Sequence, residues 1–351
     1  MPEELSMKLS TQATEIKTRQ KIAEQKDKEN KINADIDNLS RHFRRKREIT
    51  TSTAREDIGY YPAQLTSAAT FPARTPPDRH YIKPEKGPRR YWTRTNGKYT
   101  LTIEAGSAFC FKRSGREKFS LAKDCKGRPI REQLHVPSGI IPRHIMLYLC
   151  RQWKRNKSRT IPLGGSLNEF LQNVYIPRGG ESYRRIREQI RRFVHCRIGF
   201  IVTNGSTNKI REHFPKPIIE KQELWWNDNN PDQMSCLPSS ITISETLEAI
   251  LDIGAPLNIK TVTQIGGNVL AYDLYAWLTW RLYSIYRPVT VKYKDLHEQF
   301  GSHYSKIGAF KRQLRVAWDL VRQHYRHNSV LTAHGIELRK SKTDIVPINL
   351  I

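Results

Sequence analysis

The sequence predicts an α+β fold in which one unit, made of a helix, a short strand, two helices and a strand pair, occurs twice in tandem. Three observations favour this fold. Apolar residues recur at helical spacing in both halves of the chain. The third helix of each unit is rich in arginine, and two short strand-like runs around an Asn-Gly or His-Gly pair follow it. This order is that of a winged helix, so we expect two winged-helix domains, at residues 98–237 and 238–351.

The charge of the chain indicates a polyanionic partner. Its 351 residues include 60 Lys and Arg but 34 Asp and Glu, a formal net charge of +26, and the basic residues come from many segments. Such a field attracts nucleic acid or an anionic membrane. No apolar run approaches the roughly 20 residues that span a bilayer, and the first residues lack the apolar core of a signal peptide. We therefore expect a cytoplasmic protein with no membrane partner.

The five cysteines predict neither a disulfide framework nor a structural zinc site. They are odd in number, widely spaced and never arranged as CxxC, so a reducing compartment is the simpler interpretation. Cys150 and Cys196 fall within apolar helical patterns, where we expect them to pack in the core.

The N-terminal part is predicted to lie outside the folded domains. Residues 1–48 are highly charged and helix-prone, with a weak apolar stripe near their end. They are expected to form a partly disordered, solvated helix or a short partner-binding helix. Pro, Thr, Ala and Arg dominate residues 49–97, which predicts a linker. Ordered structure is expected to begin with the alternating, β-branched stretch "KYTLTIEAGSAFCF".

The first unit is expected to begin with a helix at Pro142. The segment "TIPLGG" is a short extended piece, and Ser166 with Glu169 three residues later forms a capping box for the second helix. After a turn comes the arginine-rich third helix, and "IGFIVTNGSTNKIREHF" predicts a hairpin. The buried faces of the first two helices are expected at Ile145, Leu149, Trp153, Leu167, Phe170 and Leu171.

The second unit repeats this order. "NVLAYDLYAWLTWRLYSI" is a buried helix, "VTV" a short strand, and "KYKDLHEQFG" a second helix that ends at Gly301. "SKIGAFKRQLRVAWDLVRQHY" is a long third helix, and "SVLTAHGIELRKS" gives two short strands. The residues between Leu237 and Gly267 indicate a strand, a short helix and a connector. The core of the first helix is expected at Leu270, Leu274, Trp277, Leu278 and Leu282.

The two third helices have opposite apolar and basic faces. At 100° per residue, Ile186, Ile190, Phe193 and Val194 lie together on the first, and Arg184 and Arg191 project away from them, with Arg185 and Arg192 beside. On the second, Phe310, Leu314, Ala317 and Val321 oppose Arg312, Arg315 and Arg322. A single helix of this kind is explained equally well by an ordinary solvent-exposed face and by a DNA-binding face. Two copies favour DNA recognition, because this helix of a helix-turn-helix enters the major groove or follows its phosphates.

No constellation of residues indicates catalysis. The chain has no Walker phosphate loop, no HExxH and no GxSxG motif. His324 and His327 are near each other, but no further metal ligand is suggested beside them. We therefore expect no enzymatic activity, no cofactor and no metal.

Several segments resemble the RepA-type replication initiators of bacterial plasmids. They are "VPSGIIPRHIMLYL", "KSRTIPLGGSLNEFL", "GGESYRRIREQIRRF", "AYDLYAWLTWRL", "DLHEQFG" and "FKRQLRVAWDLV", in the family's order over about residues 98 to 345. The resemblance implies binding to directly repeated origin sites (iterons) and opening of AT-rich DNA. It implies recruitment of the host initiator protein and the replicative helicase. It also implies a monomer-dimer equilibrium through the first winged domain, with dimers repressing the protein's own gene, in a bacterial cytoplasm at the plasmid or nucleoid.

The resemblance also implies different roles for the two basic helices. Base reading falls to Ser305, Lys306, Lys311, Arg312 and Arg315, and backbone binding falls to Arg184, Arg185, Arg187 and Arg191. Two other functions remain open from the sequence. One is a winged-helix transcriptional regulator without an initiator role, and the other is a basic RNA-binding or structural protein.

Overall fold

The computed structural model describes ten segments of the chain: residues 57–67, 71–76, 91–96, 99–114, 118–177, 180–204, 209–224, 239–301, 303–342 and 344–345. The residues from Ser52 onward form one compact unit. The extension predicted for residues 1–48 lies outside the described residues. No helix in the described segments is long and apolar enough to cross a membrane.

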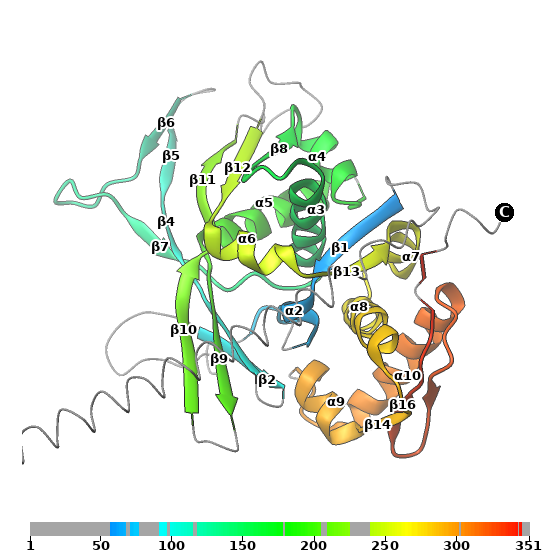
Figure 1. Cartoon of the computed structure of the whole chain (residues 1–351). Helices are drawn as coiled ribbons and strands as arrows, with labels where there is room; N and C mark the ends of the chain where they lie inside the picture. The colour runs from blue at the N-terminus through cyan, green and yellow to red at the C-terminus, as the bar shows by residue number, and fades with distance from the viewer. Residues whose placement is uncertain are drawn as a thin grey trace, which may run out of the picture. The chain divides into compact units, whose positions relative to one another are not determined.

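The first described elements lie within the predicted linker and are part of the core. Strand β1 (Ile58–Pro62) pairs antiparallel with β13 (Gly254–Asn258), and helix α2 (Ala63–Ser67) follows it (Figure 1). Strand β2 (Tyr91–Asn96) joins a larger sheet. The linker predicted for residues 49–97 is therefore wrong at these elements. Their few apolar residues, spaced between prolines, are buried: Ile58, Tyr61, Leu65, Phe71 and Trp92.

A four-stranded antiparallel sheet has the order β10-β9-β3-β2. It contains β3 (Tyr99–Glu104), β9 (Arg197–Asn204) and β10 (Lys209–Pro217). The predicted hairpin is confirmed as the antiparallel pair β9 and β10. However, β9 also pairs with β3, which precedes the first helix by more than thirty residues. The hairpin therefore extends a sheet that the order of winged-helix elements alone does not contain.

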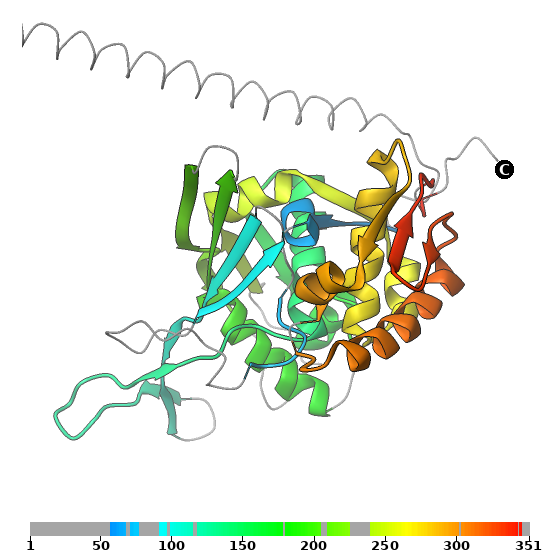
Figure 2. The same ribbon diagram turned by 90° about the horizontal axis from the view of Figure 1, so that it is seen from below.

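Residues 107–133 are called the arm, and its described parts, residues 107–114 and 118–133, project from the rest of this unit (Figures 1 and 2). Its base is formed by the paired strands β4 (Ser107–Phe109) and β7 (Arg131–Gln133). A second ribbon consists of β5 (Phe111–Ser114) and β6 (Lys118–Leu121).

The first repeat begins with α3 (Ile140–Asn156), β8 (Thr160–Gly164), α4 (Leu167–Asn173) and α5 (Gly180–His195), in the predicted order. Helix α3 begins two residues before the predicted start at Pro142. The predicted cap is confirmed, because Ser166 Oγ accepts a hydrogen bond from Glu169 N at 3.1 Å. Glu169 Oε2 in turn accepts from Gly165 N at 2.8 Å. The predicted buried face of α3 and α4 is confirmed.

Strand β8 lies in a three-stranded sheet of order β11-β12-β8, with β11 (Ile219–Glu223) and β12 (Ser239–Ile243). Helix α6 (Glu245–Asp252) follows, and Glu248 accepts a hydrogen bond from Trp153 of α3 at 2.9 Å. The structure thus disagrees with the domain boundary that was predicted between residues 237 and 238, because β12 and α6 pack against elements of the first repeat. Residues beyond that boundary complete the sheet and cover the first helix of the first repeat.

The second repeat has all its elements in the predicted order. After α7 (Ile259–Ile265) come α8 (Val269–Ser284), β14 (Val289–Lys292), α9 (Tyr293–Phe300), α10 (Ile307–His324), β15 (Val330–Leu331) and β16 (Gly335–Leu338). The three strands form one antiparallel sheet of order β14-β16-β15. The predicted core of α8 is confirmed, since all five of its predicted residues are buried.

Buried polar contacts join the first helices of the two repeats. Arg143 of α3, fully buried, donates from Nε and Nη2 to the two carboxylate oxygens of Asp273 of α8 at 2.6 and 2.7 Å. It also donates to the carbonyl oxygens of Gly139 and Phe71 at 2.6 and 2.5 Å. A buried ion pair is stable only when further hydrogen bonds satisfy its charges. The contacts with Asp273 hold α3 against α8, and the contact with Phe71 holds it against the segment after α2.

Candidate nucleic-acid interface

Helix α10 presents a basic face to solvent, and most of its apolar residues lie on the other side, although Ile307 and Val316 are exposed. Phe310, Leu314, Ala317 and Val321 are buried as predicted, and Trp318 joins them. The five candidate base-reading residues are all exposed: Ser305, Lys306, Lys311, Arg312 and Arg315. Lys311 Nζ lies 4.5 Å from the centroid of the Tyr293 ring, which directs it toward α9. The structure therefore brings these residues together on one surface around the first half of α10.

The loop before α10 is held by packing. Tyr304 is half-buried, and its ring lies 5.8 Å from that of Phe310. His297 Nε2 is 3.0 Å from Tyr304 O, so the imidazole holds the loop against α9. Burial and the nearby Arg94 and Arg74 guanidinium groups lower the pKa of His303 to about 4. Tyr304 therefore packs at the entry of α10.

A second set of exposed cations flanks α10 and was missed from the sequence. Arg326 follows the helix, and Lys340 and Lys342 follow β16. Lys340 Nζ lies 5.7 Å from the Tyr286 ring centroid, and Tyr286 is among the most exposed apolar side chains. The basic run "RKSK" at residues 339–342 is visible in the sequence. Its position near α10 could not be predicted, because it depends on the pairing of β15 with β16.

Helix α5 also buries its predicted apolar face, namely Ile186, Ile190, Phe193 and Val194. Arg184 and Arg185 are exposed, whereas Arg187 is half-buried. Glu188 of the same helix pairs with Arg192, at 2.7 Å.

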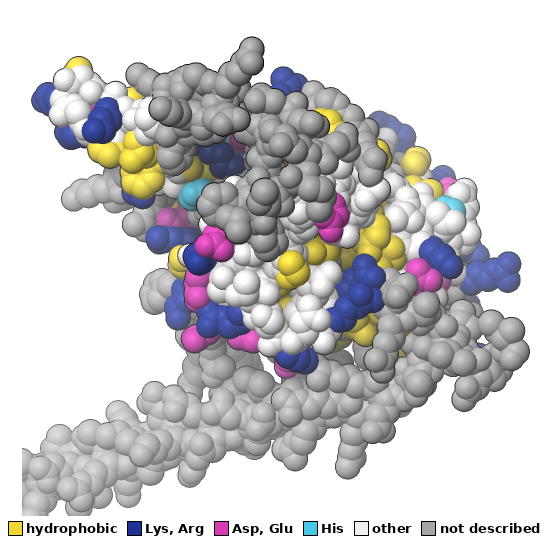
Figure 3. Space-filling view, turned by 90° about the horizontal axis from the view of Figure 1, so that it is seen from above, with side chains coloured by type: hydrophobic (Ala, Val, Ile, Leu, Met, Phe, Trp, Pro, Cys, Tyr) yellow, Lys and Arg dark blue, Asp and Glu magenta, His cyan; other side chains and the backbone are white. Residues whose placement is uncertain are grey.

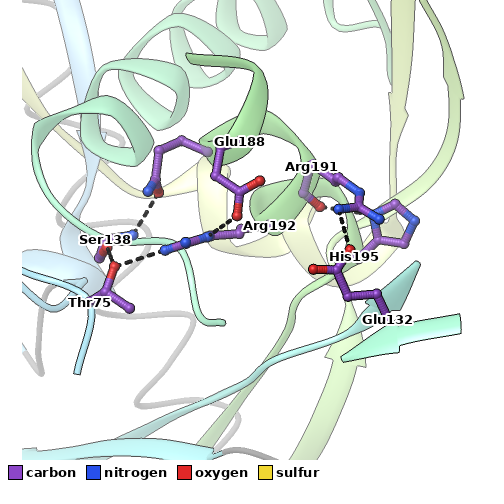
Figure 4. A network of polar contacts seen from close by, with 8 residues as sticks. Thr75, Glu132, Ser138, Glu188, Arg191, Arg192 and His195 are labelled. Carbon is purple, nitrogen blue, oxygen red and sulfur yellow. Dashed lines mark hydrogen bonds and ion pairs between the residues drawn. The ribbon is translucent and has the colours of Figure 1, made fainter. Parts of the chain in front are cut away.

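Arg191 has a partner that sequence spacing did not indicate. Its Nη1 lies 2.8 Å from Glu132 Oε2, on β7 of the arm (Figure 4). Of the predicted backbone-binding residues, Arg191 is thus partly neutralised from a distant segment.

A shallow cavity of about 430 Å³ lies beside the first turns of α5. Arg184, Arg185 and Arg192 line it together with Thr75 and Ser138. Arg192 Nη1 donates to Thr75 Oγ1 at 2.8 Å, and the two hydroxyl oxygens of Thr75 and Ser138 are 2.9 Å apart (Figure 4). The amino end of α3, Gly139 to Ile141, forms the rest of the wall with Glu188 and Gln189. Guanidinium groups, hydroxyls and a helix amino end are groups that bind an oxyanion such as phosphate.

Helices α5 and α10 lie on the same side of this unit. In Figure 2 both run along the lower edge of the molecule, α5 toward the arm and α10 away from it. Figure 1 gives the same left-to-right sequence of arm, α5 and α10. Two basic helices on one side can contact a single extended polyanion.

The described residues contain no cluster suited to a metal. Among them, no three His, Cys, Asp or Glu side chains lie together as potential ligands. The four cysteines in the described segments are free, and the predicted burial of Cys150 and Cys196 is confirmed. Tyr183 is half-buried and packs against the core.

Comparison with known proteins bears on this geometry. The sequence model of the family described as plasmid encoded RepA protein matches residues 136–293, which confirms the resemblance found in the motifs. This match runs from the residues before α3 to the start of α9, so α10 lies beyond it. No curated protein sequence matches the chain. Two crystal structures of domains 2 and 3 of RctB are similar to this chain. One has 10% sequence identity and a TM-score of 0.44, and the match covers 79% of this chain and 96% of that chain. The other has 11% identity and a TM-score of 0.39, and the match covers 72% of this chain and 82% of that chain.

Proposed function

We propose that this chain is a non-enzymatic initiator of plasmid replication that binds duplex DNA sequence-specifically. The match of residues 136–293 to plasmid-encoded RepA supports a role in starting replication. The observation that carries DNA binding is the pair of helices α5 and α10, which lie on the same side of the unit (Figure 2) and each carry exposed arginines.

We infer that both repeats are winged helices. The second supports this best, because its helices and strands follow the winged-helix order and β16 lies between β14 and β15. The first has the same order of elements, but its hairpin pairs with β3 and its strand β8 pairs with β12. In our proposal the first repeat is a winged helix whose wing has been absorbed into a larger sheet.

In this proposal α10 reads bases and α5 holds the phosphate backbone. Arg312 and Arg315 are exposed in the first half of α10, where a recognition helix reaches base edges. The exposed Lys340 and Lys342 beyond β16, near the carboxyl end of α10, would contact phosphates farther along the duplex. The cavity lined by Arg184, Arg185 and Arg192 would hold one backbone phosphate, a contact that positions the protein without reading sequence.

The finer parts of the function come from the family resemblance. They are binding to iterons, opening of an AT-rich tract, recruitment of the host initiator and replicative helicase, and a monomer-dimer equilibrium in which dimers repress the gene. We propose a cytoplasmic protein at the plasmid or nucleoid. The rival proposal of a winged-helix repressor uses the same surface and differs only in the DNA that it occupies.

Footprinting on the DNA that flanks the gene tests the proposal. An initiator is expected to protect tandem repeats beside an AT-rich tract. Protection of one inverted repeat over a promoter would instead establish a regulator. No protection, together with binding to RNA, would establish a basic RNA-binding protein.

A further inference from the structure

The arm, residues 107–133, is joined firmly to the basic helix of the first repeat. Glu132 on β7 pairs with Arg191 of α5 at 2.8 Å. A Cβ atom on Gly106, just before β4, would lie 2.0 Å from the carbonyl oxygen of His195, the last residue of α5. Gln133 Nε2 donates to the carbonyl oxygens of Ala105 and Gly106, both at 3.2 Å. The arm therefore continues the surface of α5 beyond the carboxyl end of that helix.

The arm carries an excess of positive charge. Its 27 residues include eight Lys and Arg but three Asp and Glu. Two of the acids already have basic partners within the protein. Glu132 pairs with Arg191, and Asp124 accepts from Arg128 Nε at 2.9 Å and from two backbone N–H groups of its own turn. These bonds, the one from the Arg128 backbone first, lower the pKa of Asp124 and keep it ionised. Lys123 and Lys126, both exposed, add charge that these pairs do not offset.

The same arm exposes apolar side chains. Phe109, Leu121 and Ile130 are 40%, 41% and 38% exposed, and Arg131 lies over the Phe109 ring at 4.3 Å. Figure 3 shows basic and apolar side chains next to one another on this projection, at the upper left. Within the described strands, neither ribbon of the arm has a third strand that could cover them.

A basic two-stranded ribbon with apolar side chains matches the chemistry of a DNA groove. The major groove is about 12 Å wide and admits a β-ribbon, and DNA-binding arms combine cations for phosphates with apolar groups against base steps. The arm, α5 and α10 also follow one another along the same side (Figure 2). Given the proposed function, on which this inference rests, duplex DNA held by α5 would pass the arm next.

We propose that the arm is a third DNA-contacting element, which grips the duplex flanking the segment held by α5. Lys123 and Lys126 contact phosphates, while Phe109, Leu121 and Ile130 lie against sugars and base edges in the groove. The arm thereby lengthens the bound DNA on one side only, the side away from α10.

The test compares three forms of the full chain on the protected duplex. They are the wild type, Lys123→Ala with Lys126→Ala in the arm, and Lys216→Ala with Lys260→Ala as a matched control outside it. Hydroxyl-radical footprinting should show that the arm variant loses protection at one edge only, while the control keeps both edges. The salt dependence, log K against log[salt], should become shallower by about 2 for the arm variant, close to two phosphate contacts. Removing the flank from that edge should weaken the wild type and leave the arm variant nearly unchanged.

The apolar contacts need a second variant, Phe109→Ser with Leu121→Ser. Its melting temperature should stay within a few degrees of wild type, because both side chains are exposed, whereas protection at the same edge should weaken. Unchanged footprint edges in both arm variants, with a normal wild-type footprint, would overturn the arm proposal alone. A shift from dimer to monomer in sedimentation with footprint edges unchanged would instead make the arm a self-association surface. Absence of any wild-type footprint would overturn the proposed function and the arm proposal together.

Discussion

At the scale of single residues, Arg312 and Arg315 on α10 should decide sequence preference. A bidentate arginine–guanine contact discriminates by about 1–3 kcal/mol against the wrong base, whereas a phosphate contact carries no direct sequence information. Arg312→Ala or Arg315→Ala should therefore weaken specific binding far more than binding to random DNA, and relax preference at one or two base pairs. Competition between site and scrambled duplexes at fixed salt measures this.

Two comparisons make that result interpretable. Arg322→Ala, in the last turn of the same helix, removes the same charge away from the expected base contacts and should change both kinds of binding alike. Arg184→Ala at the cavity beside α5 should also weaken both evenly and lower the salt slope by about one. If Arg184→Ala lost sequence specificity and Arg312→Ala kept it, the roles proposed for the two helices would have to be exchanged.

Single histidines also set how the fold responds to acid. Burial lowers the pKa of His144 to about 4, although its Nδ1 contact with Val174 O, at 2.7 Å, acts in the other direction. The unfolded chain binds this proton near pH 6.5, and the folded chain does not until about pH 4. Stability is therefore present above pH 6.5 and lost as the pH falls toward 4, by about 2 kcal/mol at pH 5 for this residue.

His144→Gln isolates this effect. The variant should be less stable than wild type at pH 7.5, because it disturbs a packed site, yet lose less stability between pH 7.5 and 5. Urea unfolding at the two pH values measures the difference, with the exposed His334→Gln as the control. Equal losses in all three proteins would show that His144 does not contribute to the acid response.

At the scale of elements, strongly periodic helices were predictable and strands paired over long distances were not. The apolar positions of α8 and α10 repeat every three or four residues, so their buried faces followed from sequence alone. Strand β1 lies in a proline-rich stretch whose composition is that of a linker. It becomes a strand because β13, far along the chain, supplies its hydrogen bonds.

The candidate site was predictable to the same extent. Helical spacing placed Arg312 and Arg315 on an outward face, and the structure leaves both exposed. Spacing could not reveal that Glu132 pairs with Arg191, since the two residues meet only through the attachment of the arm. The sequence shows which arginines a helix carries, whereas the acidic residues that pair with them can come from distant segments.

Helix α8 yields a prediction about stability. Trp277 is buried, and its ring packs edge-on against Phe300 of α9 with centroids 5.6 Å apart. Trp277→Ala should cost roughly 3–5 kcal/mol in the free energy of unfolding, as for other large buried aromatics. A variant that kept its melting temperature but lost DNA binding would contradict this placement and make Trp277 a base-stacking residue.

At the scale of the whole molecule, the net charge of +26 sets how binding responds to salt. If about six to ten phosphates are contacted, affinity should fall about 10³- to 10⁵-fold between 50 and 200 mM salt. Fluorescence anisotropy on a labelled duplex across that range measures the slope. A slope near zero would remove the nucleic-acid hypothesis.

The buried pair Arg143–Asp273 should control how rigidly the two repeats are held. Arg143→Met leaves the Asp273 carboxylate buried without its cation, which should cost about 3–5 kcal/mol. Adding Asp273→Leu removes the unpaired charge and should restore much of that stability. A double variant as unstable as Arg143→Met would show that the bonds to Phe71 and Gly139 carry the effect instead.

The pairing of β1 with β13 also has a consequence for synthesis. Pro62 is made roughly 190 residues before its partner Gly254, an interval of about 10–40 s at 5–20 residues per second. Throughout that time Tyr61 and Leu65, buried in the finished protein, have no β13 to complete their environment. The amino-terminal half therefore leaves the ribosome as an unfinished fold, and truncation before residue 254 should yield an aggregation-prone product in place of an independent domain. The last third of the chain thus completes the assembly of its beginning.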